Sequence, residues 1–213
     1  MRDDGGMKTI AVANRKGGAG RTTIAINLAQ ALCERTEVAL VEAAGPTPTL
    51  TWYESGQSLG SCNGLSLPDM LDLLADSGHG FAVVDCSSVQ GVALEAIFGR
   101  AHLVIAPTRP NPLDIDVTMD FLDRFVANGG RALAVFNMVA PRGVPINADT
   151  TFLAAKHAVA RTEVRNRVTY REDVNVFTEG TNAAAADEMR SLACEVAEAL
   201  LPRTFAVGAL SAP

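Results

Sequence analysis

The 213-residue sequence predicts a single α/β domain built on a mostly parallel, twisted sheet with helices on both faces. Short apolar runs alternate with longer amphipathic ones, which is typical of strands joined by crossover helices. The apolar runs are continuous, as expected for strands that are buried on both faces. We expect strands at 9–13, 38–41, 81–84, 103–106 and 132–136, and a further short strand at 164–168. We expect helices at 21–34, 66–76, 89–98, 112–127, 147–160 and 182–201.

Proline and glycine mark several boundaries of these elements. Pro68 and Asp69 suit the first turn of the second helix, and Gly129-Gly130 ends the fourth helix. Residues 43–64 are rich in Gly, Pro, Ser and Thr, so we expect a long loop there, of the functional or mobile kind. The domain should span residues 7–201, with terminal tails at 1–6 and 202–213.

Composition restricts the class of protein. A net charge of −6 means that nucleic-acid binding would need a local basic patch. The four cysteines form no C-x-x-C pair, which indicates reduced thiols and a cytoplasmic location; Cys86 should be a small buried hydrophobe. No secretory leader is visible, and no apolar run reaches the roughly 18 residues that span a bilayer.

A glycine-rich loop follows the first predicted strand and leads into the first helix. Glycines at this position let backbone N–H groups converge on phosphate oxygens, and the helix N-terminus favours negative charge. Thr22 stands where a hydroxyl normally binds Mg²⁺. The predicted nucleotide-binding residues of the loop are Lys16, Gly17, Gly18, Ala19, Gly20, Arg21, Thr22 and Thr23.

This loop resembles the deviant Walker A motif of the ParA/MinD family, whose hallmark is a lysine at the position of Lys16. The resemblance implies a P-loop NTPase that binds ATP and Mg²⁺ and forms a nucleotide-sandwich homodimer, in which Lys16 reaches the partner's phosphates. Arg21 stands where the family has lysine. Glu42 and Ala44 stand where it has two aspartates, so we expect Glu42 to act with Lys16 in catalysis and hydrolysis to be weakened at Arg21 and Ala44.

Other segments carry the resemblance from residue 8 to about 200. Asp85 closes an apolar strand, as the Walker B aspartate does, and is predicted to lie in the Mg²⁺ shell. Residues 106–114 resemble the family's V-x-P-S-P-L-D segment, which leads into its dimer region. Asn137 follows the fifth strand where the family's asparagine reads the adenine edge, a role that suits an amide.

A basic cluster lies in the C-terminal third of the chain. Small ParA-type proteins bind DNA without sequence specificity in this region, so the resemblance implies contacts to phosphates, although a solvated basic face is nearly as compatible with the sequence. We expect no MinD-type basic membrane helix and no membrane partner, since the segment around Pro202 and Gly208 is neither basic nor suited to a helix. The predicted DNA-binding residues are Lys156, Arg161, Arg165, Arg167 and Arg171.

Two functions remain open at this stage. The first is a dimerising ATPase for DNA partition or cargo positioning, stimulated by a ParB-like partner protein. The second is a degenerate, non-catalytic relative that binds nucleotide or serves as a scaffold, which Arg21 and Ala44 favour. A metabolic relative such as an amidoligase or a dethiobiotin synthetase-like enzyme is disfavoured by Lys16, and the absence of a second domain also disfavours an amidoligase.

Overall fold

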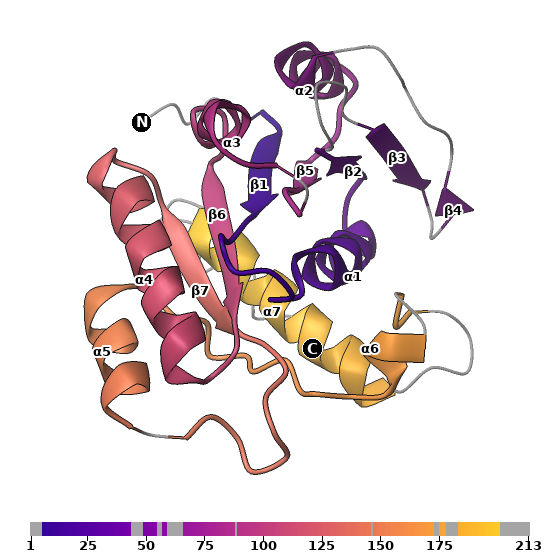
Figure 1. Ribbon diagram of the computed structural model, residues 1–213. Coiled ribbons are helices and arrows are strands. Elements are labelled where there is room, and N and C mark those ends of the chain that lie inside the picture. The colour runs from indigo at the N-terminus through magenta and orange to yellow at the C-terminus, as the bar shows by residue number, and fades with distance from the viewer. Residues whose placement is uncertain are drawn as a thin grey trace.

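A computed structural model of the chain describes residues 6–43, 49–54, 57–58, 66–87, 89–145, 147–172, 175–177 and 183–200. Its central sheet has the strand order β4-β3-β2-β5-β1-β6-β7 and lies between two layers of helices (Figure 1). The five strands from β2 to β7 in this order are parallel, whereas β3 pairs antiparallel with both β2 and β4. The strands are Lys8–Val12 (β1), Val38–Glu42 (β2), Thr49–Glu54 (β3), Gln57–Ser58 (β4), Phe81–Asp85 (β5), Leu103–Thr108 (β6) and Ala132–Phe136 (β7).

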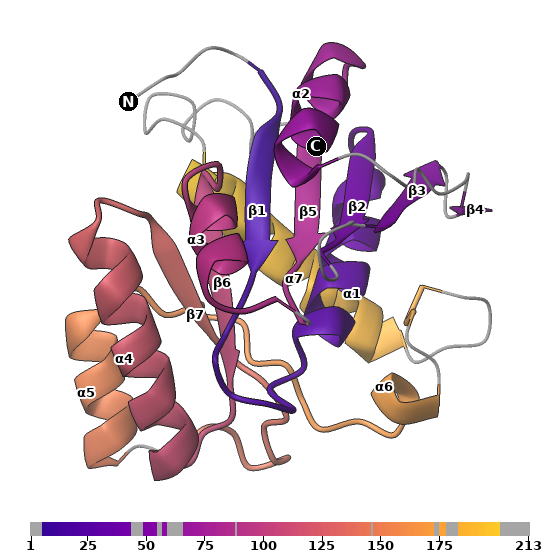
Figure 2. The ribbon, with the colours of Figure 1, turned by 45° about the horizontal axis from the view of Figure 1, so that its top comes forward.

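The helices divide between the two faces of the sheet (Figure 2). Helices α1 and α7 cover one face, while α2, α3 and α4 cover the other, with α5 packed beside α4. The short helix α6 was not predicted from the sequence. The helices are Arg21–Cys33 (α1), Leu67–Asp76 (α2), Val92–Phe98 (α3), Pro112–Ala127 (α4), Ala148–Lys156 (α5), Thr169–Glu172 (α6) and Ala183–Leu200 (α7).

The central strands are buried on both faces, as their continuous apolar sequences predict. In β1, Ile10 and Val12 pack in the core beneath α1 and α7. Ala11 and Ala13 pack in the opposite core beneath α2, α3 and α4. Side chains of a strand point alternately to the two faces, so every position of such a strand must be apolar.

The predicted helix boundaries are confirmed at α2 and α4. Ser66 caps α2 by accepting a hydrogen bond from the Asp69 N–H, and a proline occupies the first turn. Gly129 follows α4 with a φ of 81°, a conformation that glycine adopts without steric cost. The sequence therefore marks both boundaries through residues with a direct conformational role.

Four predictions are wrong in detail. The segment 43–64 is not simply a loop, because its described parts form the antiparallel strands β3 and β4. Helix α5 ends at Lys156, and the following residues leave the helix to form a bridge from Val159 to β7. The proposed strand at 164–168 is only an isolated bridge between Val139 and Arg165, and α3 begins at Val92 rather than at residue 89.

Candidate phosphate-binding site

The glycine-rich loop joins the carboxyl end of β1 to the first turn of α1, at the edge of the sheet where ligands bind in such folds. Gly18 and Gly20 have φ values of 70° and 89°. A Cβ at Gly20 would lie 2.1 Å from the Asn137 amide nitrogen, so the backbone requires glycine at this position on two grounds. The first turn of α1 has no side-chain cap and no acidic residue, which leaves its positive end available to an anion.

Asn14 anchors the start of the loop although it was not predicted as a site residue. Its buried amide nitrogen donates to the Pro107 carbonyl at 2.7 Å and to the Thr118 hydroxyl at 2.8 Å. Its amide oxygen accepts from the Lys16 N–H at 3.1 Å. One side chain thus connects the phosphate loop to β6 and α4.

Lys16 does not extend freely into solvent but contacts the start of α4. Its Nζ lies 3.3 Å from the Asp114 Oδ1, and Arg109 binds the other carboxylate oxygen. The Asp114 side chain is only 2% exposed, whereas that of Lys16 is 33% exposed. Burial alone would raise the pKa of Asp114, but the hydrogen bonds from Arg109, Asn111 and Lys16 outweigh it and hold the pKa below its usual value.

Two further predicted residues contact the backbone of the loop. Arg21 donates through Nη1 to the Asn14 carbonyl at 2.6 Å and lines a cleft beside α3. Asn137 donates to the Ala19 carbonyl at 2.8 Å, while its amide oxygen accepts from the Met138 N–H. The structure therefore brings Asn137 to the phosphate loop, and its predicted contact with adenine stays a prediction.

Carboxylates lie at the same edge of the sheet. Asp85 ends β5, is paired in register with Val12 of β1 and Glu42 of β2, and accepts hydrogen bonds from the N–H and hydroxyl of Ser87. Glu42 and Thr22 are exposed. Within the described ranges no three His, Cys, Asp or Glu side chains form a ready-made metal site, and Ala44 lies outside those ranges.

Cys86 follows Asp85 and is 1% exposed. Burial and the neighbouring Asp85 carboxylate raise the pKa of its thiol. The prediction that Cys86 is a small buried hydrophobe, rather than a reactive group, is confirmed by its position in the core.

The predicted DNA-binding residues are mostly paired with acids. Arg161 binds Glu195 and Glu198 of α7, and Arg167 binds Glu188 of the same helix. Lys156 pairs with Asp123 of α4, and Arg165 with Glu163. Arg171 is the member of the set for which the described residues supply no acidic partner; it donates to Asn166. The structure thus neutralises much of the charge that the sequence pattern suggested.

Comparisons with known proteins agree with this arrangement. A family model described as an AAA domain matches residues 7–46. The maintenance of carboxysome distribution protein A of Halothiobacillus neapolitanus is 31% identical over 206 residues, covering 88% of the chain and 95% of that relative. The chain belongs to the ParA/MinD family of P-loop ATPases.

Solved structures show the same fold as this family member. MinD of Pyrococcus horikoshii in complex with Mg-ADP has a TM-score of 0.67 at 17% identity, covering 89% of this chain and 96% of that one. An ATP complex of a Cyanothece McdA variant has a TM-score of 0.62 at 17% identity, with coverage of 91% and 96%. In the described part of this ParA/MinD-family chain, no helix is long and apolar enough to cross a membrane.

Sequence reasoning missed the residues that hold the loop of this family member in place. Asn14 at the start of the loop binds Thr118, about a hundred residues away, and Arg109 binds the Asp114 carboxylate that also contacts Lys16. The sequence does offer a signal for Asn14, because it is a polar residue that directly follows an apolar, buried strand. A buried amide needs several hydrogen-bond partners, so a structural role for Asn14 could have been predicted. Thr118 lies inside an amphipathic helix and gives no such signal.

Proposed function

We propose that the chain is a nucleotide-dependent positioning ATPase that binds ATP and Mg²⁺, dimerises face to face and distributes a large cargo. The carboxysome, named for the Halothiobacillus relative, is the first candidate cargo. The observation that carries the proposal is the contact between Lys16 and Asp114. It holds a partly exposed cation at the rim of the phosphate loop, from which it can be released toward a second copy.

The residues present fit a magnesium nucleotide. Positions 17 and 18 have no atom within 4 Å of an added Cβ, so the loop is open on its outer side. The uncapped first turn of α1 supplies backbone N–H groups for phosphate oxygens. Thr22 and Asp85 would hold Mg²⁺, which neutralises phosphate charge when it is bound.

Exposed apolar side chains around the loop support face-to-face dimerisation. Leu113, which precedes Asp114, is 75% exposed, and Val92 at the start of α3 is 87% exposed. Gly91, which precedes Val92, lines the same cleft as Arg15 and Arg21. Exposed apolar side chains beside a charged site favour burial of this face against another protein surface.

Substitution of Lys16 tests the proposal directly. We expect Lys16→Ala to abolish nucleotide-dependent dimerisation and stimulated ATP turnover, because a cation that completes the partner's phosphate site is removed. Light scattering with ATP and turnover assays with DNA and the partner protein measure the two effects. Arg142→Ala, which removes an exposed cation from another loop, should change neither; retained dimerisation in Lys16→Ala would overturn the proposal.

Arg21 is expected to limit nucleotide affinity or hydrolysis. Its planar guanidinium is longer than a lysine ammonium and is bonded to the Asn14 carbonyl, so it is poorly suited to a tight phosphate cradle. We expect Arg21→Lys to raise ATP affinity or turnover by about tenfold, which corresponds to roughly 1.4 kcal/mol. Titration with a fluorescent ATP analogue and a turnover assay measure this, and no change in either would contradict this role of Arg21.

Nonspecific DNA binding through the predicted basic residues is part of the proposal. Arg165 and Arg167 are partly exposed, at 33% and 26%, and ion pairs that water reaches contribute only about 1 kcal/mol, so DNA phosphates can compete with their acidic partners. We expect Arg165→Ala combined with Arg167→Ala to weaken ATP-dependent DNA binding and to reduce the salt slope by about 2. Gel shifts over a salt series measure both quantities, and an unchanged affinity and slope would remove these residues from the DNA site.

A further inference from the structure

A groove runs between α3 and α4, beginning at the phosphate loop. Its first hollow has a volume of about 310 Å³ and is bordered by Arg15 and Arg21 of the loop. A second hollow of about 490 Å³ continues toward Gly129 and Gly130 after the end of α4. The two hollows share three lining residues, which are Glu95, Phe98 and Arg124.

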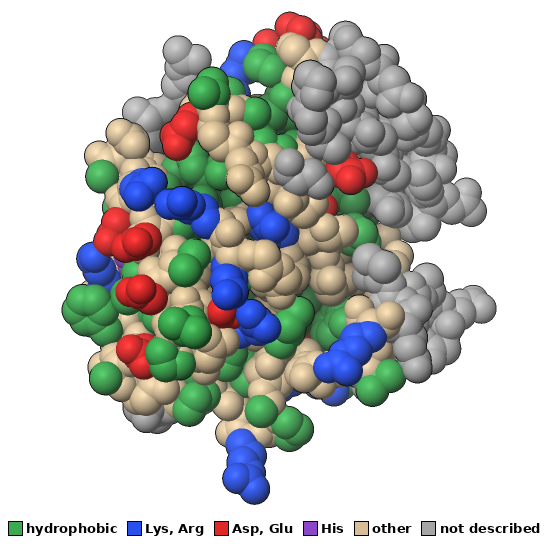
Figure 3. Space-filling view, in the orientation of Figure 1, with side chains coloured by type: hydrophobic (Ala, Val, Ile, Leu, Met, Phe, Trp, Pro, Cys, Tyr) green, Lys and Arg blue, Asp and Glu red, His purple; other side chains and the backbone are tan. Residues whose placement is uncertain are grey.

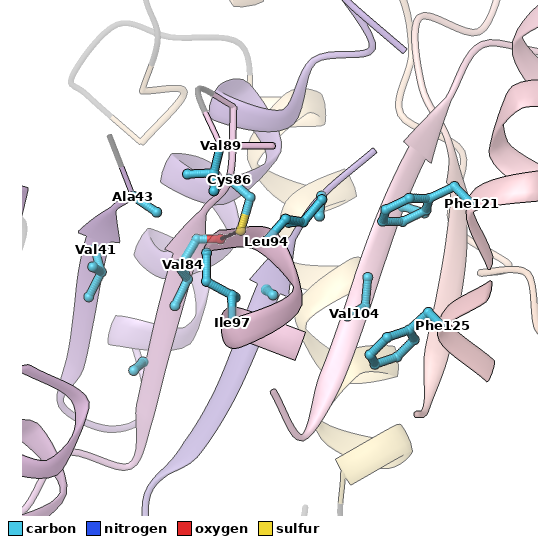
Figure 4. Packing of buried hydrophobic residues seen from close by; sticks show 14 of the residues in the cluster. Val41, Ala43, Val84, Cys86, Val89, Leu94, Ile97, Val104, Phe121 and Phe125 are labelled. Carbon is cyan, nitrogen blue, oxygen red and sulfur yellow. Dashed lines mark hydrogen bonds between the residues drawn. The ribbon is translucent and has the colours of Figure 1, made fainter. Parts of the chain in front are cut away.

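The floor of this α3–α4 groove is apolar and aromatic. Phe98 of α3 meets Phe121 and Phe125 of α4 edge to face, with ring centroids 5.6 and 4.8 Å apart. Figure 4 shows Leu94 of α3 pointing toward the two α4 rings, which lie beside Val104 of β6. Phe121 and Phe125 are core residues, 3% and 5% exposed, so the half-buried Phe98 presents the accessible part of this rigid floor to an apolar side chain.

The rim of the groove carries positive charge that the protein leaves unpaired. Among the described residues, the guanidinium groups of Arg15 and Arg124 have no ion-pair partner. Glu95 is the one acidic residue of the lining, and it too is unpaired there. Figure 3 shows Lys and Arg side chains gathered on the face that carries α4 and the phosphate loop.

This pattern contrasts with that of the C-terminal basic residues. In that cluster the chain supplies acids from α4 and α7 for Lys156, Arg161 and Arg167. An acidic protein that neutralises those cations but leaves Arg15 and Arg124 free around one groove has a local charge surplus at that groove. Guanidinium groups bind carboxylates in pairs of hydrogen bonds, so the surplus fits an acidic ligand.

We propose that the α3–α4 groove binds a segment of a partner protein that presents carboxylates beside apolar side chains. The apolar side chains would pack on Phe98, which the buried rings of Phe121 and Phe125 hold in place, and the carboxylates would pair with Arg15 and Arg124. The proposal adds to the proposed function the chemistry of the partner protein and the surface that it contacts. It rests on the proposed function in one respect, because it takes the partner to be the protein that stimulates ATP hydrolysis.

The shape and chemistry of the groove separate this ligand from a nucleic acid. A nucleic-acid backbone would satisfy the arginines, but Phe121 and Phe125 are only 3% and 5% exposed and leave no open ring face on which a base could stack. A peptide segment offers both kinds of group within a few residues. Contacts that combine a buried apolar anchor with an arginine pair dominate the energetics of many protein interfaces.

A peptide selection followed by direct binding measurements tests the proposal. The full chain, kept free of nucleotide so that the proposed face-to-face dimer does not cover the groove, is used to select from a displayed library of random 16-residue peptides. Enriched peptides are synthesised, labelled and titrated by fluorescence anisotropy against the unaltered chain, Arg124→Glu and Arg142→Glu. The last variant makes the same charge change at an exposed arginine outside the groove and is the matched control.

We expect the enriched peptides to combine net negative charge with apolar residues. Their affinity should fall at least tenfold in Arg124→Glu and should stay within twofold in Arg142→Glu. Failure to enrich any peptide, enrichment of neutral or basic peptides, or equal losses in the two variants would overturn the proposal. Loss of ATP-dependent dimerisation in Arg124→Glu with unchanged peptide binding would identify the groove as a contact between copies and would also overturn it.

The outcome is independent of the test of the ATPase function. Peptide affinity is read without turnover, and Lys16→Ala is tested without peptide. A chain that binds acidic peptides but neither dimerises nor hydrolyses ATP would keep the groove proposal and reject the proposed ATPase. The reverse pattern would reject the groove alone.

Discussion

Replacement of Gly20 by alanine should abolish nucleotide binding, with a loss of at least about 100-fold, or roughly 2.7 kcal/mol of binding free energy. The residue has a φ of 89°, and an added Cβ would lie 2.1 Å from the Asn137 amide nitrogen. Relief of this contact requires the loop to move away from Asn137, and the hydrogen bond to the Ala19 carbonyl is then lost. Titration with a fluorescent ATP analogue measures the affinity.

Gly78→Ala is the matched control for this substitution. Gly78 has nearly the same φ, 88°, but an added Cβ would meet nothing within 4 Å. We expect it to cost about 1–2 kcal/mol of unfolding free energy through backbone strain and to leave nucleotide affinity unchanged. If the two variants lost affinity equally, backbone strain and not the contact with Asn137 would explain the loss.

The second large effect is expected at Asp114. Its buried carboxylate binds Lys16 and Arg109, so Asp114→Asn should leave two cations without their counterion. Removal of one member of a buried pair costs up to 3–5 kcal/mol, and the partial exposure of both cations lowers the expected loss to about 2 kcal/mol at pH 7. Urea unfolding of the two chains gives the difference directly.

The pH dependence of this difference follows from the lowered pKa of Asp114. A carboxyl group whose pKa is lower in the folded than in the unfolded chain stabilises the protein at pH values above its unfolded pKa, which is about 3.9. This stabilisation is lost as the pH falls through the pKa of the folded state. The difference between Asp114→Asn and the unaltered chain should therefore be constant above about pH 5 and shrink below about pH 4. A difference that persisted undiminished at pH 2 would show that Asn disturbs packing rather than charge. Asp72→Asn, at an exposed ion pair with Arg100, should change the stability much less than Asp114→Asn.

Five of the six predicted strands agree with the structure within two residues at each boundary because burial on both faces demands an uninterrupted apolar run; the sixth, at 164–168, is only an isolated bridge. Strand β3 was missed because it lies beside the edge strand β4, outside the buried parallel strands, in a segment whose Gly, Pro, Ser and Thr content is typical of a loop. Helix α5 was predicted too long because residues after Lys156 have helical composition but pair with β7 instead. Hydrogen bonds between segments that are distant in the sequence determine whether such a segment forms a helix or pairs with the sheet, and the local sequence does not predict these hydrogen bonds.

In the candidate site, too, the features that depend on local sequence were predicted and those that depend on tertiary contacts were not. The loop from Lys16 to Thr23 is a local motif, and the sequence places it correctly between strand and helix. The ion pairs of Arg161 and Arg167 depend on α7, in which their partners lie about 20 to 40 residues further along the chain. A signal for them did exist, since Glu188, Glu195 and Glu198 follow the spacing of one helix face and so predict an acidic stripe.

The Asn14 side chain has a thermodynamic consequence that extends beyond the loop. It connects the Lys16 backbone to Thr118 of α4, and α4 also forms one wall of the groove. A ligand that shifts one of these elements therefore changes the free energy of binding at the other. Because such coupling is reciprocal, a tenfold gain in partner affinity caused by ATP requires a tenfold gain in ATP affinity caused by the partner. Contact with the partner protein would then retain nucleotide, and loss of nucleotide would release the partner protein.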